Sequence, residues 1–379
     1  MVKKSRVFFA GRERRRKITK VFIRPLIPKY REDKNSRRQG VVFSIKCGNR
    51  LSKEVWYRFS SGPVSQTSDF ILPVCLLPAM QNQTLLKIPG KVSTHLLQGV
   101  NKIQQIFSSR DPKFSILEIE TGGPWQDPQA SAGKVGQFFS GGVDSSYTLL
   151  KHFDEIDTII FVHGFDIPLA NQALRSKVSE AIKDTAYKLG KELIEVETNL
   201  RGFSDLYTDW GQDYHGSALA SIALLLAPQF RKFYIPATYS YKNLFPRGSD
   251  PLLDPLWSTE KVKIVHDGCE ANRVEKINLI SKNDIILKHL RVCWENRKGA
   301  YNCCECEKCL RTMVSLAIIG ALEGCPAFPQ PLDLSLVAGM KINEHLKMFV
   351  EDNLKAAKQL NNSDLAAALQ RCLTGYLNS

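Results

Sequence analysis

Residues 135–146 read VGQFFSGGVDSS, and no other part of the chain carries as much structural information. The apolar run that ends at Phe139 predicts a buried strand, the two glycines that follow predict a tight turn, and residues 146–153 continue as a helix. Glycine lets a backbone approach an anion closely, and the amides and dipole at a helix N-terminus attract negative charge. This stretch therefore predicts a loop that holds phosphate.

The loop offers three kinds of group to a phosphate. We expect backbone amides from the glycines and Val143, and hydroxyl donors from the serines. Asp144 would repel a phosphate, so we expect it to orient the loop or to hold Mg²⁺. No Gly-Lys-Ser/Thr follows, which excludes a Walker loop. A glycine turn without a ligand is the alternative. The expected nucleotide-binding set is Ser140, Gly141, Gly142, Val143, Asp144, Ser145 and Ser146, with Asp144 and Ser145 as the catalytic residues.

Strand and helix patterns alternate after this loop. Buried strands are expected at residues 158–162, 193–196 and 233–236, and helices at residues 176–189 and 217–226. Such alternation predicts an α/β fold, a doubly wound and mostly parallel sheet with helices on both faces. Ligands of these folds bind beyond the carboxyl ends of the strands.

Different patterns flank this domain. Before it, strands at residues 41–45 and 55–59 around a turn at 48–50, a helix at 93–107 capped by Ser93, and a strand at 114–119 predict a small α+β domain. After it, helices are expected at residues 342–360 and 364–377. The expected divisions are 1–38, a basic arm; 39–130, the accessory domain; 134–325, the nucleotide domain; and 326–379, a helical tail.

The net charge of +14 is concentrated at one end of the chain. Residues 1–38 hold 15 Lys and Arg against three acids, whereas the rest is nearly neutral, with 37 basic and 35 acidic residues. This arm is either a solvated or edge-lining segment, or a contact for tRNA or a partner protein. No apolar run is long enough to span a bilayer and no signal peptide is recognisable, so neither a membrane nor a secreted protein is expected.

Five of the ten cysteines fall within 17 residues. The two C-x-x-C spacings predict Cys303, Cys306 and Cys309 as metal ligands, with Cys293 as the fourth. Four thiolates suit a structural Zn²⁺, and we expect nearby cations, Arg291, Lys308 and Arg311 among them, to offset their charge. A set with Cys304 in place of Cys303, an iron–sulfur cluster and a metal-free loop are the alternatives. Free thiols indicate a reducing, cytoplasmic location.

The segment 139–145, FSGGVDS, resembles the pyrophosphatase loop of the N-type ATP pyrophosphatases. This superfamily includes the asparagine synthetase, GMP synthetase and tRNA-thiolating domains. The resemblance implies that ATP adenylates a carbonyl or carboxylate oxygen and that pyrophosphate leaves into the loop. An amine, ammonia or sulfur nucleophile then displaces AMP. Mg²⁺ and preformed donors suit the departing pyrophosphate.

The loop and the cysteines together resemble the 7-cyano-7-deazaguanine synthase family over residues 134–325. The resemblance implies an ATP-dependent ligase that forms a carbon–nitrogen bond, with Cys293, Cys303, Cys306 and Cys309 on zinc. Where that family carries Pro-Gly-Arg-Asn, this chain has Tyr214-His215-Gly216-Ser217, and its loops at 237–241 and 247–255 also differ. A related enzyme with an extra N-terminal domain is therefore expected, acting on a small heterocycle or another carboxylate.

Further polar residues lie after the expected strands. His163 and Arg247 are expected to contact the nucleotide, His163 because it follows a strand with Asp166, and Arg247 because a guanidinium suits phosphate. Arg273 is a similar candidate, and Cys269 is either a buried thiol or a nucleophile. Two other functions stay open: a tRNA-modifying enzyme that uses the basic arm, and a non-catalytic ATP-binding scaffold. An assembly of identical chains is also open.

Overall fold

A parallel sheet of five strands forms the centre of the molecule. The computed structural model describes residues 22–25, 28–33, 38–47, 52–126 and 133–377. The central strands lie side by side in the order β13-β12-β9-β10-β11, and every neighbouring pair is parallel. Their bounds are β9 Lys134–Phe138, β10 Thr158–His163, β11 Glu192–Thr198, β12 Phe230–Pro236 and β13 Lys263–Asp267. The expected α/β class with a mostly parallel central sheet is confirmed.

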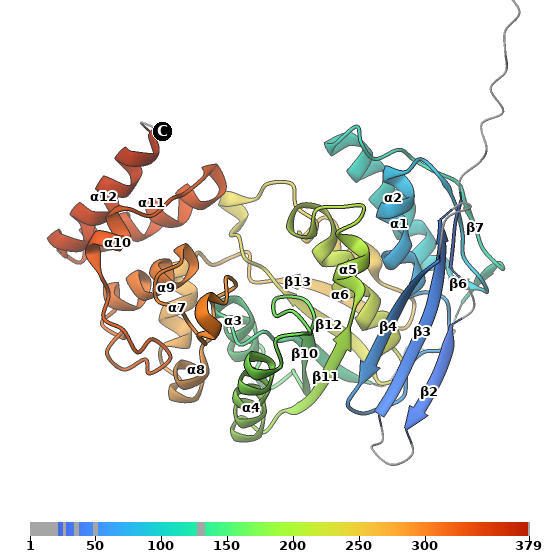
Figure 1. Ribbon diagram of the computed structural model, residues 1–379, viewed down its shortest axis with the longest axis horizontal. Coiled ribbons are helices and arrows are strands. Elements are labelled where there is room, and N and C mark those ends of the chain that lie inside the picture. Colours follow the sequence, from blue (N-terminus) through green and yellow to red (C-terminus); the bar gives the residue numbers. More distant parts are fainter. Residues whose placement is uncertain (1–21, 26–27, 34–37, 48–51, 127–132, 378–379) are drawn as a thin grey trace, which may run out of the picture.

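Antiparallel strands from the N-terminal part extend this sheet. β4 (Lys53–Phe59) pairs with β11, and β3 (Arg38–Cys47) pairs with β4. The described part of the basic arm supplies β1 (Phe22–Pro25) and β2 (Lys29–Asp33), which both pair with β3 (Figure 1). The sheet is thus mixed, and the strands before residue 60 share it with the strands of residues 134–267. The short strands are β5 Leu85–Lys87 and β7 Ile119–Glu120, which continue this sheet, and β6 Val92–Ser93 and β8 Pro124–Trp125, which form a separate pair.

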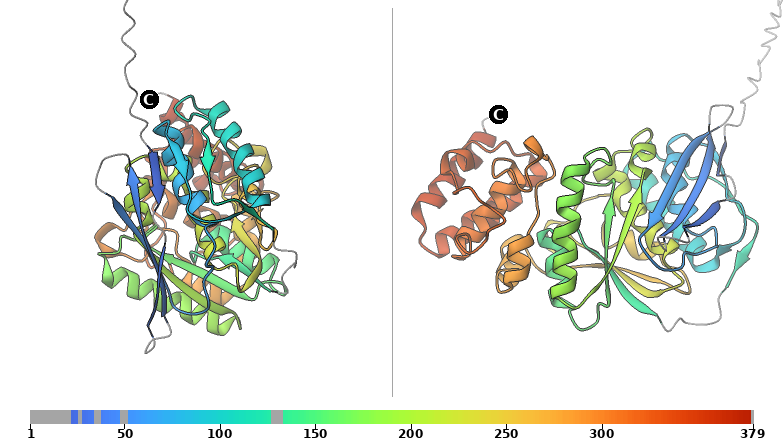
Figure 2. Two further views of the ribbon diagram at one scale, coloured as in Figure 1. Left: turned by 90° about the vertical axis from the view of Figure 1, so that its right-hand side faces the viewer. Right: turned by 60° about the horizontal axis from the view of Figure 1, so that its bottom comes forward.

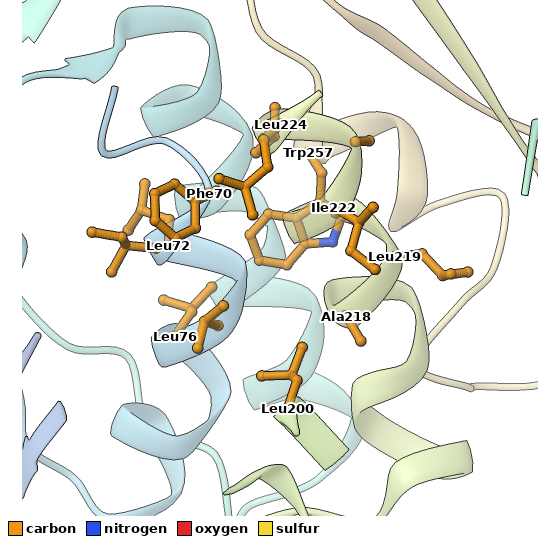
Figure 3. Packing of buried hydrophobic residues seen from close by; sticks show 14 of the residues in the cluster. Phe70, Leu72, Leu76, Leu200, Ala218, Leu219, Ile222, Leu224 and Trp257 are labelled. Atoms are coloured by element: carbon orange, nitrogen blue, oxygen red, sulfur yellow. The ribbon is translucent and has the colours of Figure 1, made fainter. Parts of the chain in front are cut away.

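Each face of the sheet packs against its own helices. On one face, α1 (Ile71–Gln81) lies against α6 (His215–Leu225), and Figure 3 shows Phe70, Leu76 and Ile222 around the Trp257 ring. The other face packs against helices that follow the central strands, in a second apolar cluster. They are α3 Val143–Lys151, α4 Gln172–Lys188, α7 Arg273–Ile280 and α8 Asp284–His289.

The C-terminal helices form a third apolar cluster at the opposite end of the molecule from β2 and β3 (Figures 1 and 2). The cluster includes α9 (Glu307–Ile318), which follows the cysteine loop. The expected tail helices are confirmed as α11 (Glu344–Gln359) and α12 (Ser363–Leu377). The remaining helices are α2 Thr94–Arg110, α5 Leu200–Ser204 and α10 Leu334–Ala338.

Most local predictions hold, with three differences. Ser93 caps α2 by accepting a hydrogen bond from the Leu96 amide, as expected. The strand expected at residues 114–119 is wrong: the Ser115 amide donates to the Met80 carbonyl and the Leu117 amide to the Gln104 side chain, so only Ile119 enters a strand. α3 begins three residues earlier than expected, and α4 four. The turn expected at 48–50 lies outside the described residues.

Within the part of the chain that the structure describes, none of the helices combines the length and the apolar character that a membrane span needs.

Candidate functional site

The loop after β9 has the backbone shape that its glycines predict. Gly141 has a φ of +75°, a region that residues with a side chain rarely adopt, and Gly142 precedes the first turn of α3. The Gly141 carbonyl accepts a hydrogen bond of 2.8 Å from the Arg291 amide, so the loop is tied to the segment that leads into the cysteines. The Ser145 hydroxyl donates to the Gly142 carbonyl at 3.1 Å and braces the loop from inside.

The predicted loop residues have different roles in the structure. Ser140, Asp144 and Ser145 line a cavity of about 200 Å³ at the N-terminal end of α3. Val143 is buried in the apolar cluster, so only its backbone faces the loop. The Ser146 hydroxyl is buried and has no hydrogen-bond partner among the described residues, and Ser146 does not line the cavity.

This cavity combines apolar walls with cationic groups. Phe161, Phe165 and Ile167 provide the apolar part, whereas Arg291 and Lys308 bring positive charge. Burial lowers the pKa of the Lys308 ammonium, and the nearby Arg311 lowers it further. An anion in the cavity would relieve the cost of burying these charges. The cavity is therefore suited to a molecule with an anionic part and an apolar part.

Asp144 lies among cations. Its Oδ2 atom is 3.1 Å from the Arg273 Nη2 atom, and its Oδ1 atom is 3.4 Å from the Lys276 Nζ atom. Burial raises the pKa of the Asp144 carboxyl, but the opposite charges of Arg273 and Lys276 outweigh this and hold that pKa at about 2. Asp144 is therefore ionised and joins the loop to α7.

A second cavity of about 470 Å³ adjoins the first, because His215, Thr238 and Lys308 line both. Arg247 lies in this second cavity, with its Cζ atom 5.6 Å from the centre of the Tyr239 ring. The structure thus brings Arg247 to the neighbourhood of the loop. Burial lowers the pKa of the His215 imidazole, which favours its neutral form. No role was assigned to His215 in the sequence analysis.

His163 lies apart from both cavities. Its Nε2 atom is 3.2 Å from the Glu195 Oε1 atom, and its Nδ1 atom is 3.4 Å from the Arg175 Nε atom. It lines a separate cavity of about 340 Å³ between α4, β11 and β4. The strand position was predicted correctly, but the loop cavity meets β10 at Ile160 and Phe161 as well, before the strand reaches His163. Val162 lines the loop cavity, and His163 does not.

Several other polar residues near the site serve local structure. Asp213 pairs with Lys113 at 2.9 Å, and Asp209 accepts a hydrogen bond from the Gln212 amide in the π-helical turn before α6. Asp205 is 3.5 Å from Arg201 on the surface. Cys269 is buried, and its thiol is within hydrogen-bonding reach of His266, whose Nδ1 atom is 2.8 Å from Asp254.

The four predicted metal ligands come together. The sulfur atoms of Cys293, Cys303, Cys306 and Cys309 all lie within 4.8 Å of one another, with Cys303 to Cys309 at 3.9 Å and Cys293 to Cys306 at 4.0 Å. Tetrahedral Zn²⁺ with bonds of about 2.3 Å places its sulfurs about 3.8 Å apart, so the cluster fits this ion. Hydrogen bonds from Cys306 and Cys309 lower the pKa of the Cys293 thiol.

The fifth cysteine of the cluster points elsewhere. Cys304 has a φ of +58°, and its sulfur is 3.8 Å from the Asn302 carbonyl oxygen. The structure therefore selects Cys303, and not Cys304, for the ligand set. Cys306 directly precedes α9 and Cys309 lies in its first turn, so a bound ion would fix the start of this helix.

Sequence reasoning missed how the cysteine loop is held together. The Asn302 amide donates to the carbonyls of Leu290 and Ala327, at 2.8 and 3.0 Å, and its oxygen accepts from the amides of Val292 and Cys293. One buried side chain thus links three segments. An asparagine among cysteines gives no signal of this in the sequence.

No protein-family model matches the chain, and neither the curated proteins nor the solved structures contain a match.

Proposed function

We propose that the chain is an ATP-dependent ligase of the N-type ATP pyrophosphatase class, similar to the 7-cyano-7-deazaguanine synthases. In this proposal its doubly wound pyrophosphatase fold binds ATP at residues 140–146, adenylates a carbonyl or carboxylate of an acceptor, and releases pyrophosphate. The observation that supports it best is the glycine loop at the start of α3 facing Arg291 and Lys308 across one cavity.

The loop would hold the leaving pyrophosphate. The amides of the first helical turn have no partner within the helix, so they are free to donate to phosphate oxygens. Lys308 and Arg291 would neutralise the charge that develops as the bond to the α-phosphate breaks. Because these groups are already in place, little reorganisation would accompany the reaction.

Each of the two adjoining cavities would bind a different substrate. The smaller cavity, with its phenylalanine walls, suits the adenosine and the loop suits the phosphates. The larger cavity would take the acceptor, with Arg247 available to a carboxylate. His215 lines both cavities as a neutral imidazole, so we assign it the role of the base that takes a proton from the attacking amine.

The metal-binding residues differ in how well they fit. The four cysteines fit a structural Zn²⁺, which would hold α9 and with it Lys308 and Arg311. For Mg²⁺, the lining offers the carboxylates of Asp144 and Asp166, and Mg²⁺ in ATP sites needs only one or two beside the phosphates. Since Asp144 is paired with Arg273 and Lys276, the role of Asp144 at Mg²⁺ stays a prediction.

Incubation of the zinc-loaded protein with ATP, Mg²⁺ and a metabolite extract tests the proposal. We expect pyrophosphate release that depends on the extract, together with AMP-linked acceptors detectable by mass spectrometry. A Ser145→Ala variant should lose most of this release, because Ser145 braces the loop. Unchanged turnover in Ser145→Ala would contradict the assignment.

The same experiment separates the two alternatives. ATP binding without pyrophosphate release would favour a non-catalytic scaffold. Release that depends on added tRNA, and that is lost when residues 1–21 are deleted, would favour an RNA-modifying enzyme. Residues 22–33 are retained in this deletion because β1 and β2 belong to the sheet.

A further inference from the structure

The C-terminal helices reach the arginine side chains of the candidate site, although the family resemblance ends before these helices. α11 packs against α7 and α9, the helices that carry Arg273 and Arg311. Lys341 and Leu346 line the larger cavity, and the His345 ring stacks on Phe245 with ring centres 4.0 Å apart. Residues 341–346 thus contribute directly to the walls around the site.

Phe349 of α11 contacts both of these arginines. The Arg311 Cζ atom is 3.9 Å from the centre of the Phe349 ring, and the Arg273 Cζ atom is 5.6 Å from it. The centre of the Tyr239 ring lies 5.5 Å from the centre of the Phe349 ring. Phe349 itself is buried, at 4% exposure. One aromatic ring therefore contacts two guanidinium groups in a water-poor environment, where cation–π attraction is strongest.

Both guanidinium groups keep donors without a partner. The Arg311 and Arg273 side chains are only 5% and 3% exposed. Among the described residues, the Nε and Nη1 atoms of Arg311 and the Nε atom of Arg273 have no hydrogen-bond partner. Glu307 lies 3.2 Å from the Arg311 Nε atom as an ion pair, but it is not aligned for a hydrogen bond. Buried donors of this kind are rare, and a bound acceptor would satisfy them.

We propose that Phe349 is a positioning residue of the phosphate site. Its ring packs against the Arg311 guanidinium in the larger cavity, beside Lys308, which lines both cavities, and leaves the Arg311 N–H groups free for the oxygens of a pyrophosphate that spans the two. The inference rests on the proposed function. It makes α11 part of the site, so the C-terminal helices are required for phosphate binding and not only for stability.

Calorimetric titration of the zinc-loaded full-length protein with inorganic pyrophosphate tests this role. We expect Phe349→Leu to weaken binding about tenfold, and Phe349→Tyr, which keeps the ring, to stay within about threefold of the wild type. Val350→Ala is the matched control, because Val350 is the next residue of α11 and is buried in the C-terminal cluster. It should lower the melting temperature and leave the affinity unchanged.

A double-mutant cycle with Arg311→Gln separates positioning from general damage. If Phe349 acts through Arg311, then Phe349→Leu adds little once Arg311 is already replaced. Additive losses, or an unchanged affinity in Phe349→Leu, would overturn the role of Phe349 and leave the proposed function standing. If the wild-type protein binds no pyrophosphate, this result contradicts both the role of Phe349 and the proposed function.

Discussion

The two walls of the loop cavity are built in different ways. One wall is the loop at residues 140–146, where the glycines, the serine brace and the start of α3 are neighbours in the chain. The facing wall gathers Arg291 and Lys308 from around the cysteines, and it continues into the adjoining cavity with Arg311, which packs on Phe349 of the tail. A contiguous loop depends on local backbone conformation, whereas an assembled wall depends on everything that holds its segments in place. The facing wall should therefore be the easier one to disrupt.

The largest effect is expected from the cysteine cluster. Cys306→Ser should remove the bound Zn²⁺, release the start of α9 and abolish pyrophosphate binding, because Lys308 and Arg311 follow directly. Metal analysis and calorimetry would measure both losses. Cys304→Ser is the matched control, and it should keep one ion per chain. Loss of the ion in Cys304→Ser would instead favour the ligand set with Cys304.

The second-largest effect is expected at His215, and little effect is expected at His163. His215→Asn should lower turnover about a hundredfold or more with little change in ATP affinity, because a base is lost from the cavity wall. His163→Gln should change both quantities less than twofold, because His163 lines a separate cavity. Steady-state kinetics and titration with ATP would measure the contrast. A tenfold loss of ATP affinity in His163→Gln would restore the role that the sequence predicts for it.

The third effect concerns Asp144, whose ion pairs join the loop to α7. Asp144 keeps a folded-state pKa of about 2, below its ordinary value of 3.8, so it contributes about 2 kcal/mol of stability above pH 4. That contribution is lost as the pH falls from about 4 to 2. The stability difference between wild type and Asp144→Asn, measured by urea unfolding, should be constant from pH 7 to 4.5 and should shrink at lower pH. A difference that grows on acidification would contradict the ion pairs.

The smallest effect is expected from the loop backbone. Gly141→Ala places a side chain at a φ of +75°, which costs about 1 kcal/mol, although the nearest atoms are 3.7 and 3.9 Å from the new Cβ atom. Gly190→Ala is the matched control, since its φ is +64° and no atom lies within 4 Å. Both variants should lose similar stability in urea, but only Gly141→Ala should bind pyrophosphate about fivefold less tightly. Equal affinities would show that the loop does not contact phosphate.

Local sequence signals were sufficient for much of the fold. The strand, glycine turn and helix around Gly141 were predicted correctly, as were the Ser93 cap and the two long tail helices. α1 was missed because it is apolar on every side and contains Pro73 and Pro78, so it has no helical periodicity. The strand at 114–119 was wrong because its amides bond to α1 and α2 instead of a neighbouring strand.

The candidate site was predicted in part, because only its local features leave a signal in the sequence. The cysteine spacing gave the four clustered residues, since C-x-x-C brings thiols together within one turn. Arg291, Lys308 and Arg311 were expected to offset the thiolates, whereas Arg291 and Lys308 line the cavity beside the loop and Arg311 lines the adjoining one. The pairing of Asp144 with Arg273 and Lys276 joins residues about 130 positions apart, and no local pattern reports such a contact.

The amino-acid sequence by itself determined the alternation of strands and helices, the glycine loop and the set of clustered thiols. Each of these follows from hydrophobic periodicity or from residues a few positions apart. Only the tertiary structure decided which charges face the loop, that His163 points away from it, and that Phe349 reaches Arg311. Those features arise from packing between distant segments, and the packing of a helix or strand depends on all its neighbours at once.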